Sequence, residues 1–87
     1  MKQVIFEARA FNDFNEWAVF DKKVYQKIIA LVKDIDRNPF VGIGKPEALK
    51  DDFAGYWSRR ITDEHRLVYK MTDVSIIIAS CKYHYEK

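Results

Sequence analysis

The segment from Asp21 to Asn38 constrains the fold most, because its apolar residues recur at helical spacing on one side. At 100° per residue they fall within an arc of about 120°, and they are Val24, Tyr25, Ile28, Leu31, Val32 and Ile35. Asp21 offers a side-chain oxygen to the free N–H groups of the first turn. Asn38-Pro39 ends the helix, because proline disfavours a helical residue before it. A helix that is apolar on one side needs a second layer to cover that side.

Strand-like runs predict that this second layer is a sheet. A short apolar run at 4–6 reads as the first strand, and further runs follow at 56–62, 65–71 and 74–83. The connections between the last three runs are short enough only for hairpin turns. We therefore expect these runs to form an antiparallel meander.

A further helix is expected between the first strand and Asp21. Apolar residues spaced by three and four share one face of this helix, and they are Phe11, Phe14, Trp17 and Ala18. The predicted order is β-α-α followed by an antiparallel β meander, which is an α+β fold. Both helices can cover one face of the sheet, and the other face is left open.

Length and composition exclude several classes of protein. The chain has 87 residues, of which 48% are hydrophobic and 32% charged, so residues 1–87 are expected to form a single folded domain. A lone Cys81 excludes an internal disulfide, and with two histidines it excludes a Cys-rich zinc site. No apolar run is long enough to span a bilayer. We expect a small cytoplasmic protein that binds no metal or other cofactor and does not associate with membranes.

The net charge of +2 gives little global attraction for nucleic acid, so any basic surface must come from local placement. The meander carries five cations, Arg59, Arg60, Arg66, Lys70 and Lys82, interleaved with Tyr56, Trp57, Tyr69, Tyr83 and Tyr85. One interpretation is an ordinary solvated sheet face whose charges discourage edge pairing. The other is a surface for single-stranded RNA, since cations bind phosphates and aromatic rings stack on unpaired bases. We expect Trp57 and Tyr69 to be core residues in either case.

Three residues together suit metal-independent RNA cleavage, in which the 2′-hydroxyl is the nucleophile. A carboxylate such as Glu47 can accept the hydroxyl proton, an imidazole such as His84 can protonate the leaving oxygen, and Arg66 can hold the developing charge. Each residue alone is unremarkable, because a loop glutamate and a terminal histidine are usually solvated bystanders. His65 is interpreted as structural.

The sequence leaves open whether Arg66 and His84 share a sheet face. Side chains alternate along a strand, so Arg66 shares a face with Val68 and Lys70, and His84 shares one with Lys82. A three-residue connection near Thr72-Asp73 would align the two faces, whereas a two-residue connection would oppose them unless a bulge intervenes.

Several motifs resemble the YoeB toxins of the RelE superfamily along essentially the whole chain. They are Asn38-Pro39-Phe40, Gly44-Lys45-Pro46-Glu47-Ala48-Leu49-Lys50, Gly55-Tyr56-Trp57-Ser58-Arg59-Arg60-Ile61-Thr62, Glu64-His65-Arg66-Leu67-Val68-Tyr69 and Lys82-Tyr83-His84-Tyr85. The resemblance implies a RelE-like fold and a type II toxin. It also implies an endoribonuclease that cleaves mRNA in the A site of the 70S ribosome.

The same resemblance implies roles for individual residues and partners. Glu47 would be the general base, His84 the general acid and Arg66 the phosphate-stabilising group, while Lys50, Arg60 and Tyr85 would hold or orient the RNA. The implied partner is a YefM-type antitoxin, and a homodimer is consistent with the resemblance. Separately, we expect an acidic, partly disordered antitoxin tail to fold across the open basic face, by charge complementarity and steric block. Two departures are Ala48, where the family often has a second proline, and the extension Glu86-Lys87.

Two other function classes stay open at this point. A ParE-like toxin that inhibits DNA gyrase without catalysis would need neither Glu47 nor His84. A plain RNA- or ribosome-binding module would bind without cutting. Supercoiling and cleavage assays discriminate among the three classes.

Overall fold

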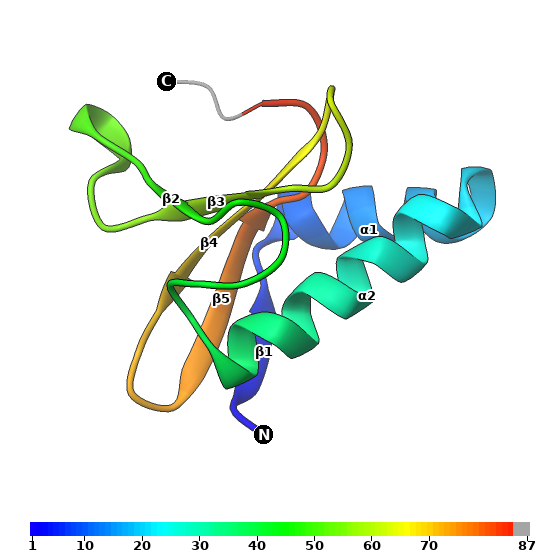
Figure 1. Ribbon diagram of the computed structural model, residues 1–87. Coiled ribbons are helices and arrows are strands. Elements are labelled where there is room, and N and C mark those ends of the chain that lie inside the picture. The colour runs from blue at the N-terminus through cyan, green and yellow to red at the C-terminus, as the bar shows by residue number, and fades with distance from the viewer. Residues whose placement is uncertain (85–87) are drawn as a thin grey trace.

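In the computed structural model, which describes residues 1–84, helix α2 (Lys22–Arg37) confirms the prediction from the apolar spacing (Figure 1). The Asp21 carboxylate accepts hydrogen bonds from the backbone N–H groups of Lys23 at 3.1 Å and Val24 at 3.3 Å. This cap satisfies donors that have no partner inside the helix. Of the six predicted apolar positions, all are buried except Tyr25, which is half-buried.

The sheet has five strands in the order β1-β5-β4-β3-β2. The predicted meander is confirmed, because β3 (Trp57–Arg60) pairs antiparallel with β4 (Arg66–Met71), which pairs antiparallel with β5 (Ser75–Ser80). β1 (Gln3–Phe6) runs parallel to β5 at the sheet's edge.

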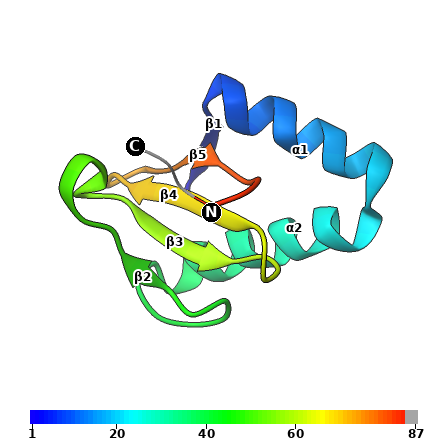
Figure 2. The same ribbon diagram turned by 90° about the horizontal axis from the view of Figure 1, so that it is seen from above.

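Both helices cover the same face of this sheet, as predicted (Figure 2). α1 (Ala8–Phe20) contacts β1, β5 and α2. The core between the layers joins the inward residues of α2 to those of β4 and β5, including Leu67, Tyr69, Ile76 and Ile78. Among the described residues, no helix is long and apolar enough to cross a membrane.

The predicted inward face of α1 is wrong at one end. Phe11 is 59% exposed, whereas Ala10 beside it is fully buried. Phe14 and Trp17 do pack against the core. A helix that begins one residue after β1 must approach β5 closely, and the small side chain of Ala10 permits that approach.

Two short elements between α2 and β3 were not predicted. β2 (Glu47–Ala48) pairs antiparallel with β3, and a 3₁₀ helix spans Asp51–Phe53. Neither has a periodicity that a sequence pattern could reveal, because each lasts only one repeat of its own period. Ala48, one of the two departures from the family pattern, is paired with Trp57 in this sheet.

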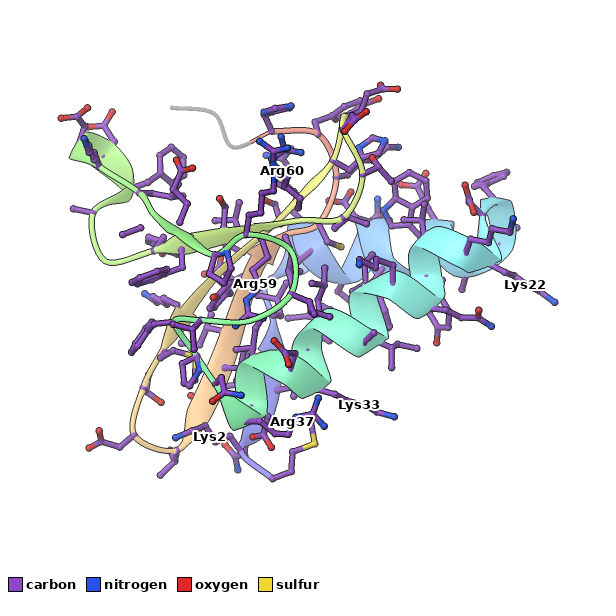
Figure 3. All side chains as sticks on the ribbon, in the orientation of Figure 1. Lys2, Lys22, Lys33, Arg37, Arg59 and Arg60 are labelled. Carbon is purple, nitrogen blue, oxygen red and sulfur yellow. The ribbon has the colours of Figure 1, made fainter. Side chains whose placement is uncertain are left out.

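Arg59 is not a surface cation, which corrects the expectation that it belongs to the exposed face of the meander. Its side chain is fully buried and its guanidinium forms an ion pair with Asp34 of α2. It also donates hydrogen bonds to the Tyr69 hydroxyl and to the backbone carbonyls of Asn38, Val41 and Ile43. The reason is strand alternation, which turns Arg59 and Trp57 toward the helices and Arg60 toward solvent. Figure 3 shows Arg59 and Arg60 leaving β3 in different directions.

The Arg59 cluster fixes the loop that precedes β2. Asp34 accepts a hydrogen bond from the backbone N–H of Ile43 at 3.1 Å, so this carboxylate and Arg59 together hold residues 38–43. Gly42 adopts φ +128°, and a Cβ there would collide with the Asp34 carboxylate. Only glycine combines this backbone conformation with this close approach.

Acid is expected to destabilise the protein through Asp34. The hydrogen bond from Arg59 holds the pKa of Asp34 below its ordinary value, and the backbone N–H of Ile43 adds to this effect. The ionised carboxylate therefore contributes stability above the unfolded-state pKa of about 3.9, and this stability is lost as the pH falls through the folded-state pKa. The free energy of unfolding, measured with urea between pH 7 and pH 3, should therefore fall less steeply in Asp34→Asn than in the parent protein.

Asp13 of α1 has the opposite influence on the pH dependence of stability, so its contribution must be measured separately from that of Asp34. Burial raises its pKa, although the backbone of Cys81 and the charges of Arg9 and Lys82 oppose the rise. The cost of its ionised form is therefore relieved as the pH falls. The comparison should be made in an Asp13→Asn background as well. If Asp34→Asn left the pH dependence of the free energy of unfolding unchanged in both the parent and the Asp13→Asn protein, that result would contradict the role of Asp34 in acid sensitivity.

Candidate functional site

The open face of the sheet carries a polar cavity of about 210 Å³. It is lined by Lys45, Glu47, Ser58, Arg60, Arg66 and His84. The structure therefore brings Glu47, Arg66 and His84 together, although they are far apart in the sequence. Three of the lining side chains are cationic and only Glu47 is anionic, so the cavity suits an anionic ligand.

Strand register explains how most of these residues meet. Glu47 lies opposite Ser58 on the β2–β3 pair, and Arg60 lies opposite Arg66 on the β3–β4 pair. Residues directly opposite each other point to the same face, and so do residues two apart along one strand. Ser58 and Arg60 thus connect Glu47 to Arg66 across the face that the helices leave uncovered.

Arg66 is anchored by the turn that precedes it. Its Nη1 donates hydrogen bonds to the carbonyls of Thr62 at 2.7 Å, Asp63 at 3.2 Å and His65 at 3.1 Å. Within residues 1–84, no partner occupies its Nε or Nη2. A guanidinium held at one nitrogen keeps its plane fixed while its other donors stay available to phosphate oxygens.

Lys45 reaches the cavity because a hydrogen bond holds the preceding residue, Gly44, against β3. The backbone N–H of Arg60 donates to the Gly44 carbonyl at 2.6 Å. Gly44 has φ +81°, and a Cβ there would lie within 3.1 Å of Leu31, Arg60 and Arg59 atoms. Lys45 follows with φ 51°, also in the left-handed region. Lys45 and Ser58 line the cavity although neither was predicted as a site residue. Both lie within the Gly44–Lys50 and Gly55–Thr62 motifs.

His84 reaches the cavity by a route that strand alternation does not describe. β5 ends at Ser80, not near Tyr83 as predicted, so His84 lies beyond the last strand. Tyr83 has φ 60°, and its carbonyl accepts a hydrogen bond from the Arg66 backbone N–H at 2.9 Å. This bond brings the segment after β5 back alongside the start of β4.

Whether Arg66 and His84 share a sheet face depends on the β4–β5 connection and on the bend at Tyr83. Three residues, Thr72 to Val74, connect β4 to β5, and a register shift also lies between Val68 and Tyr69. The face that Arg66 shares with Val68 is confirmed by the pairing of Ser58 with Val68. His84 joins that face through the bend at Tyr83 and not through alternation.

The residues expected to bind RNA are placed differently from one another. Arg60 lines the cavity. Lys50 is exposed at the start of the 3₁₀ helix and does not line it. Tyr85 lies outside the described residues, as does the Glu86-Lys87 extension.

The other aromatic, basic and thiol residues considered in the sequence lie in the core or against an aromatic ring. Tyr69 is fully buried, and Trp57 packs against the core and the ring of Phe40, as expected. Lys70 lies over the Tyr56 ring with Nζ 5.0 Å from its centroid. Cys81 is fully buried, and burial raises the pKa of its thiol to about 12, which fits a small buried hydrophobe.

A second hollow of about 330 Å³ lies next to the first on the open face. It is lined by Glu7, Arg9, Asp52, Phe53, Tyr56, Val68, Ala79 and Ser80. Val68 pairs with both Ser58 and Ser80, so the two hollows adjoin along the sheet. Among residues 1–84, no group of three His, Cys, Asp or Glu side chains is placed to hold a metal ion.

Known proteins resemble the chain along almost its whole length. The family model of the YoeB-like toxin of bacterial type II toxin-antitoxin systems matches residues 6–85. Toxin YoeB of Escherichia coli (strain K12) is 51% identical over 83 residues, which cover 95% of this chain and 99% of that protein.

Solved structures agree with the sequence comparison. The YoeB dimer from Staphylococcus aureus is 53% identical, covers 97% of this chain and 98% of its own, and superposes with a TM-score of 0.92. The heterotetrameric YoeB-YefM complex from the same organism gives 52% identity, 98% and 99% coverage, and a TM-score of 0.91. The resemblance seen in the motifs is thereby confirmed, and this chain belongs to the YoeB-like toxin family of bacterial type II toxin-antitoxin systems.

Proposed function

We propose that this toxin is a ribosome-dependent endoribonuclease that cleaves mRNA in the ribosomal A site and so inhibits translation. The observation that supports it is the cavity where Glu47, Arg66 and His84 meet beside Arg60 and Lys45. These side chains supply a proton acceptor, a proton donor and cations around one space. A non-catalytic inhibitor would not need this combination.

The proposed reaction is an internal transfer of the phosphodiester. Glu47 accepts the proton of the 2′-hydroxyl, whose oxygen attacks the adjacent phosphorus and forms a new P–O bond. Arg66, with Arg60 and Lys45, stabilises the charge of the phosphorane. The bond to the 5′-oxygen then breaks, and His84 gives that oxygen a proton. The products are a 2′,3′-cyclic phosphate and a 5′-hydroxyl, so the reaction consumes no water.

The message would run along the open face and continue from the cavity into the adjoining hollow. Tyr56 and Phe53 present aromatic surface there, with ring centroids 6.2 Å apart. Aromatic side chains stack on unpaired bases irrespective of their identity. Lys50, which does not line the cavity, and Tyr85 are proposed to hold or orient the RNA, as the resemblance implies.

We further propose that a YefM-type antitoxin silences the toxin in the cytoplasm. The YoeB of Staphylococcus aureus has been solved in a complex with YefM and also as a dimer. An acidic antitoxin segment that folds across the open face would match its cations and block the cavity. A homodimer of this chain is proposed on the same similarity.

Cleavage of a defined message on programmed 70S ribosomes tests the proposed function. We expect a cut in the A site on ribosomes, much slower cutting of the same RNA free in solution, and loss of the cut when a 2′-deoxy nucleotide replaces the target. DNA lacks the attacking hydroxyl, so the deoxy message separates binding from chemistry. Folded toxin that leaves the message intact and instead inhibits gyrase in a supercoiling assay would overturn the proposal.

A further inference from the structure

The segment that carries His84 out of β5 is held from two sides. On one side, α1 holds Cys81, whose carbonyl accepts a hydrogen bond from Trp17 Nε1 at 2.9 Å. The Cys81 thiol lies 3.5 Å from the Ala10 carbonyl. Because Cys81 is fully buried, the chain leaves the core from a fixed point, three residues before His84.

On the other side, Tyr83 is fixed by two consecutive residues at the start of β4. Its N–H donates a hydrogen bond to His65 Nδ1 at 2.8 Å, and its carbonyl accepts one from the Arg66 N–H at 2.9 Å. Tyr83 has φ 60°, a conformation that bulky residues rarely adopt. Surrounding contacts must therefore maintain it, and these two hydrogen bonds are the contacts that act on its own backbone.

The protonation state of His65 follows from the hydrogen bond. A backbone N–H can only donate, so Nδ1 of His65 must carry a lone pair and the proton of the neutral ring must lie on Nε2. The ring itself packs edge-on against Trp17, with centroids 4.9 Å apart, and lies 5.4 Å from the Tyr83 ring. The Trp17 contact therefore holds the His65 ring in addition to the hydrogen bond from the Tyr83 N–H.

We propose that His65 is a positioning residue for His84, acting through the Tyr83 N–H. The inference rests on the proposed function for its effect on cleavage, while its structural part stands on the contacts alone. Neutral His65 holds the left-handed bend at Tyr83, and the bend directs the next residue into the cavity. Without the acceptor, Tyr83 relaxes to a more extended conformation and His84 no longer faces the position of the leaving oxygen.

Two substitutions separate the acceptor from the ring. His65→Phe keeps a ring against Trp17 but removes the acceptor, whereas His65→Asn loses the ring but keeps an acceptor, Oδ1, bonded to Cγ as Nδ1 is. We expect His65→Phe to lower the single-turnover cleavage rate about 10- to 100-fold, since misplacing a reacting group by about 1 Å has such effects. Binding to programmed ribosomes should be unchanged. His65→Asn should recover most of the rate, even if its thermal stability is the lower of the two.

Nuclear magnetic resonance on the full-length toxin tests the contact without relying on cleavage. We expect the ¹⁵N spectrum to show the proton of His65 on Nε2, and the Tyr83 amide to exchange with solvent faster in His65→Phe than in the parent. A proton on Nδ1, or unchanged exchange, would overturn the proposed contact. Cleavage by His65→Phe at the parent rate would overturn the positioning role. A parent toxin that shows the contact but cuts no message would instead refute the proposed function.

Discussion

Replacing His84 by alanine is expected to slow cleavage on the ribosome by about 10²–10⁴-fold, and Glu47→Ala should have an effect of similar size. Each change removes one of the two proton transfers in the proposed reaction. Both residues are exposed at the cavity, so neither change should lower the stability of the fold. Single-turnover cleavage of a programmed message measures the rate, and thermal unfolding measures the stability.

The chemistry of the leaving group can tell the two roles apart. A message with sulfur in place of the scissile 5′-oxygen has a leaving group that departs as a thiolate without being protonated. This substrate should restore the rate of His84→Ala nearly to that of the parent, because the general acid is no longer needed. It should not restore Glu47→Ala, because the 2′-hydroxyl must still lose its proton.

A matched control comes from the turn between β3 and β4. Glu64 is an exposed glutamate that does not line the cavity, so Glu64→Ala should cleave at the parent rate. Equal rescue of the Glu47 and His84 variants by the sulfur substrate would contradict the assignment of base and acid. Parent-like cleavage of the normal message by both variants would contradict the mechanism itself.

The sequence predicts the layers of this fold well because their signals are local and repetitive. α2 is identified by an apolar stripe that spans the whole helix, together with a cap at Asp21 and a stop at Asn38-Pro39. The meander is identified by runs separated by short polar turns. The edges are different. β2 is only Glu47–Ala48, and its position is set by pairing with β3, which no local pattern records.

The site is predictable only in part, because two of its features depend on tertiary contacts. The resemblance implies roles for Glu47, Arg66 and His84, but the approach of His84 to the cavity depends on the bend at Tyr83. Alternating polar and aromatic residues after Ser80 look like a continuing strand, so the end of β5 is invisible in the sequence. It is the hydrogen bonds from Trp17 and to His65 that end the strand there.

Arg59 shows an inference that the sequence did allow. Trp57 was expected in the core, and residues two apart on a strand share a face, so Arg59 follows Trp57 toward the helices. The burial of Arg59 was not expected, because composition does not distinguish it from the adjacent Arg60 and because arginine is rarely buried. The structure distinguishes them completely: Arg59 is fully buried, and Arg60 lies at the cavity.

These adjacent arginines are expected to give opposite results when each is replaced by methionine. Arg59→Met should lower the free energy of unfolding by about 3–5 kcal/mol, since it removes the fully buried partner of Asp34 and leaves this carboxylate only the exposed Arg37, at 3.4 Å, and the backbone N–H of Ile43. Arg60→Met should change that free energy by less than about 0.5 kcal/mol, as is usual for an exposed residue. Arg60→Met should instead slow cleavage, because it removes a cation from the cavity. Urea unfolding and ribosome cleavage assays measure the two effects.

A double variant shows why Arg59 is more than one half of an ion pair. Replacing a buried pair by apolar residues often restores stability, because no unpaired charge remains. Asp34→Leu with Arg59→Met should not recover the parent stability here, since the carbonyls of Asn38, Val41 and Ile43 would still lose their donor. Those carbonyls belong to the loop that leads to Lys45 and Glu47, so cleavage should fall together with stability. A double variant as stable and as active as the parent would mean that Arg59 neither satisfies this loop nor positions it.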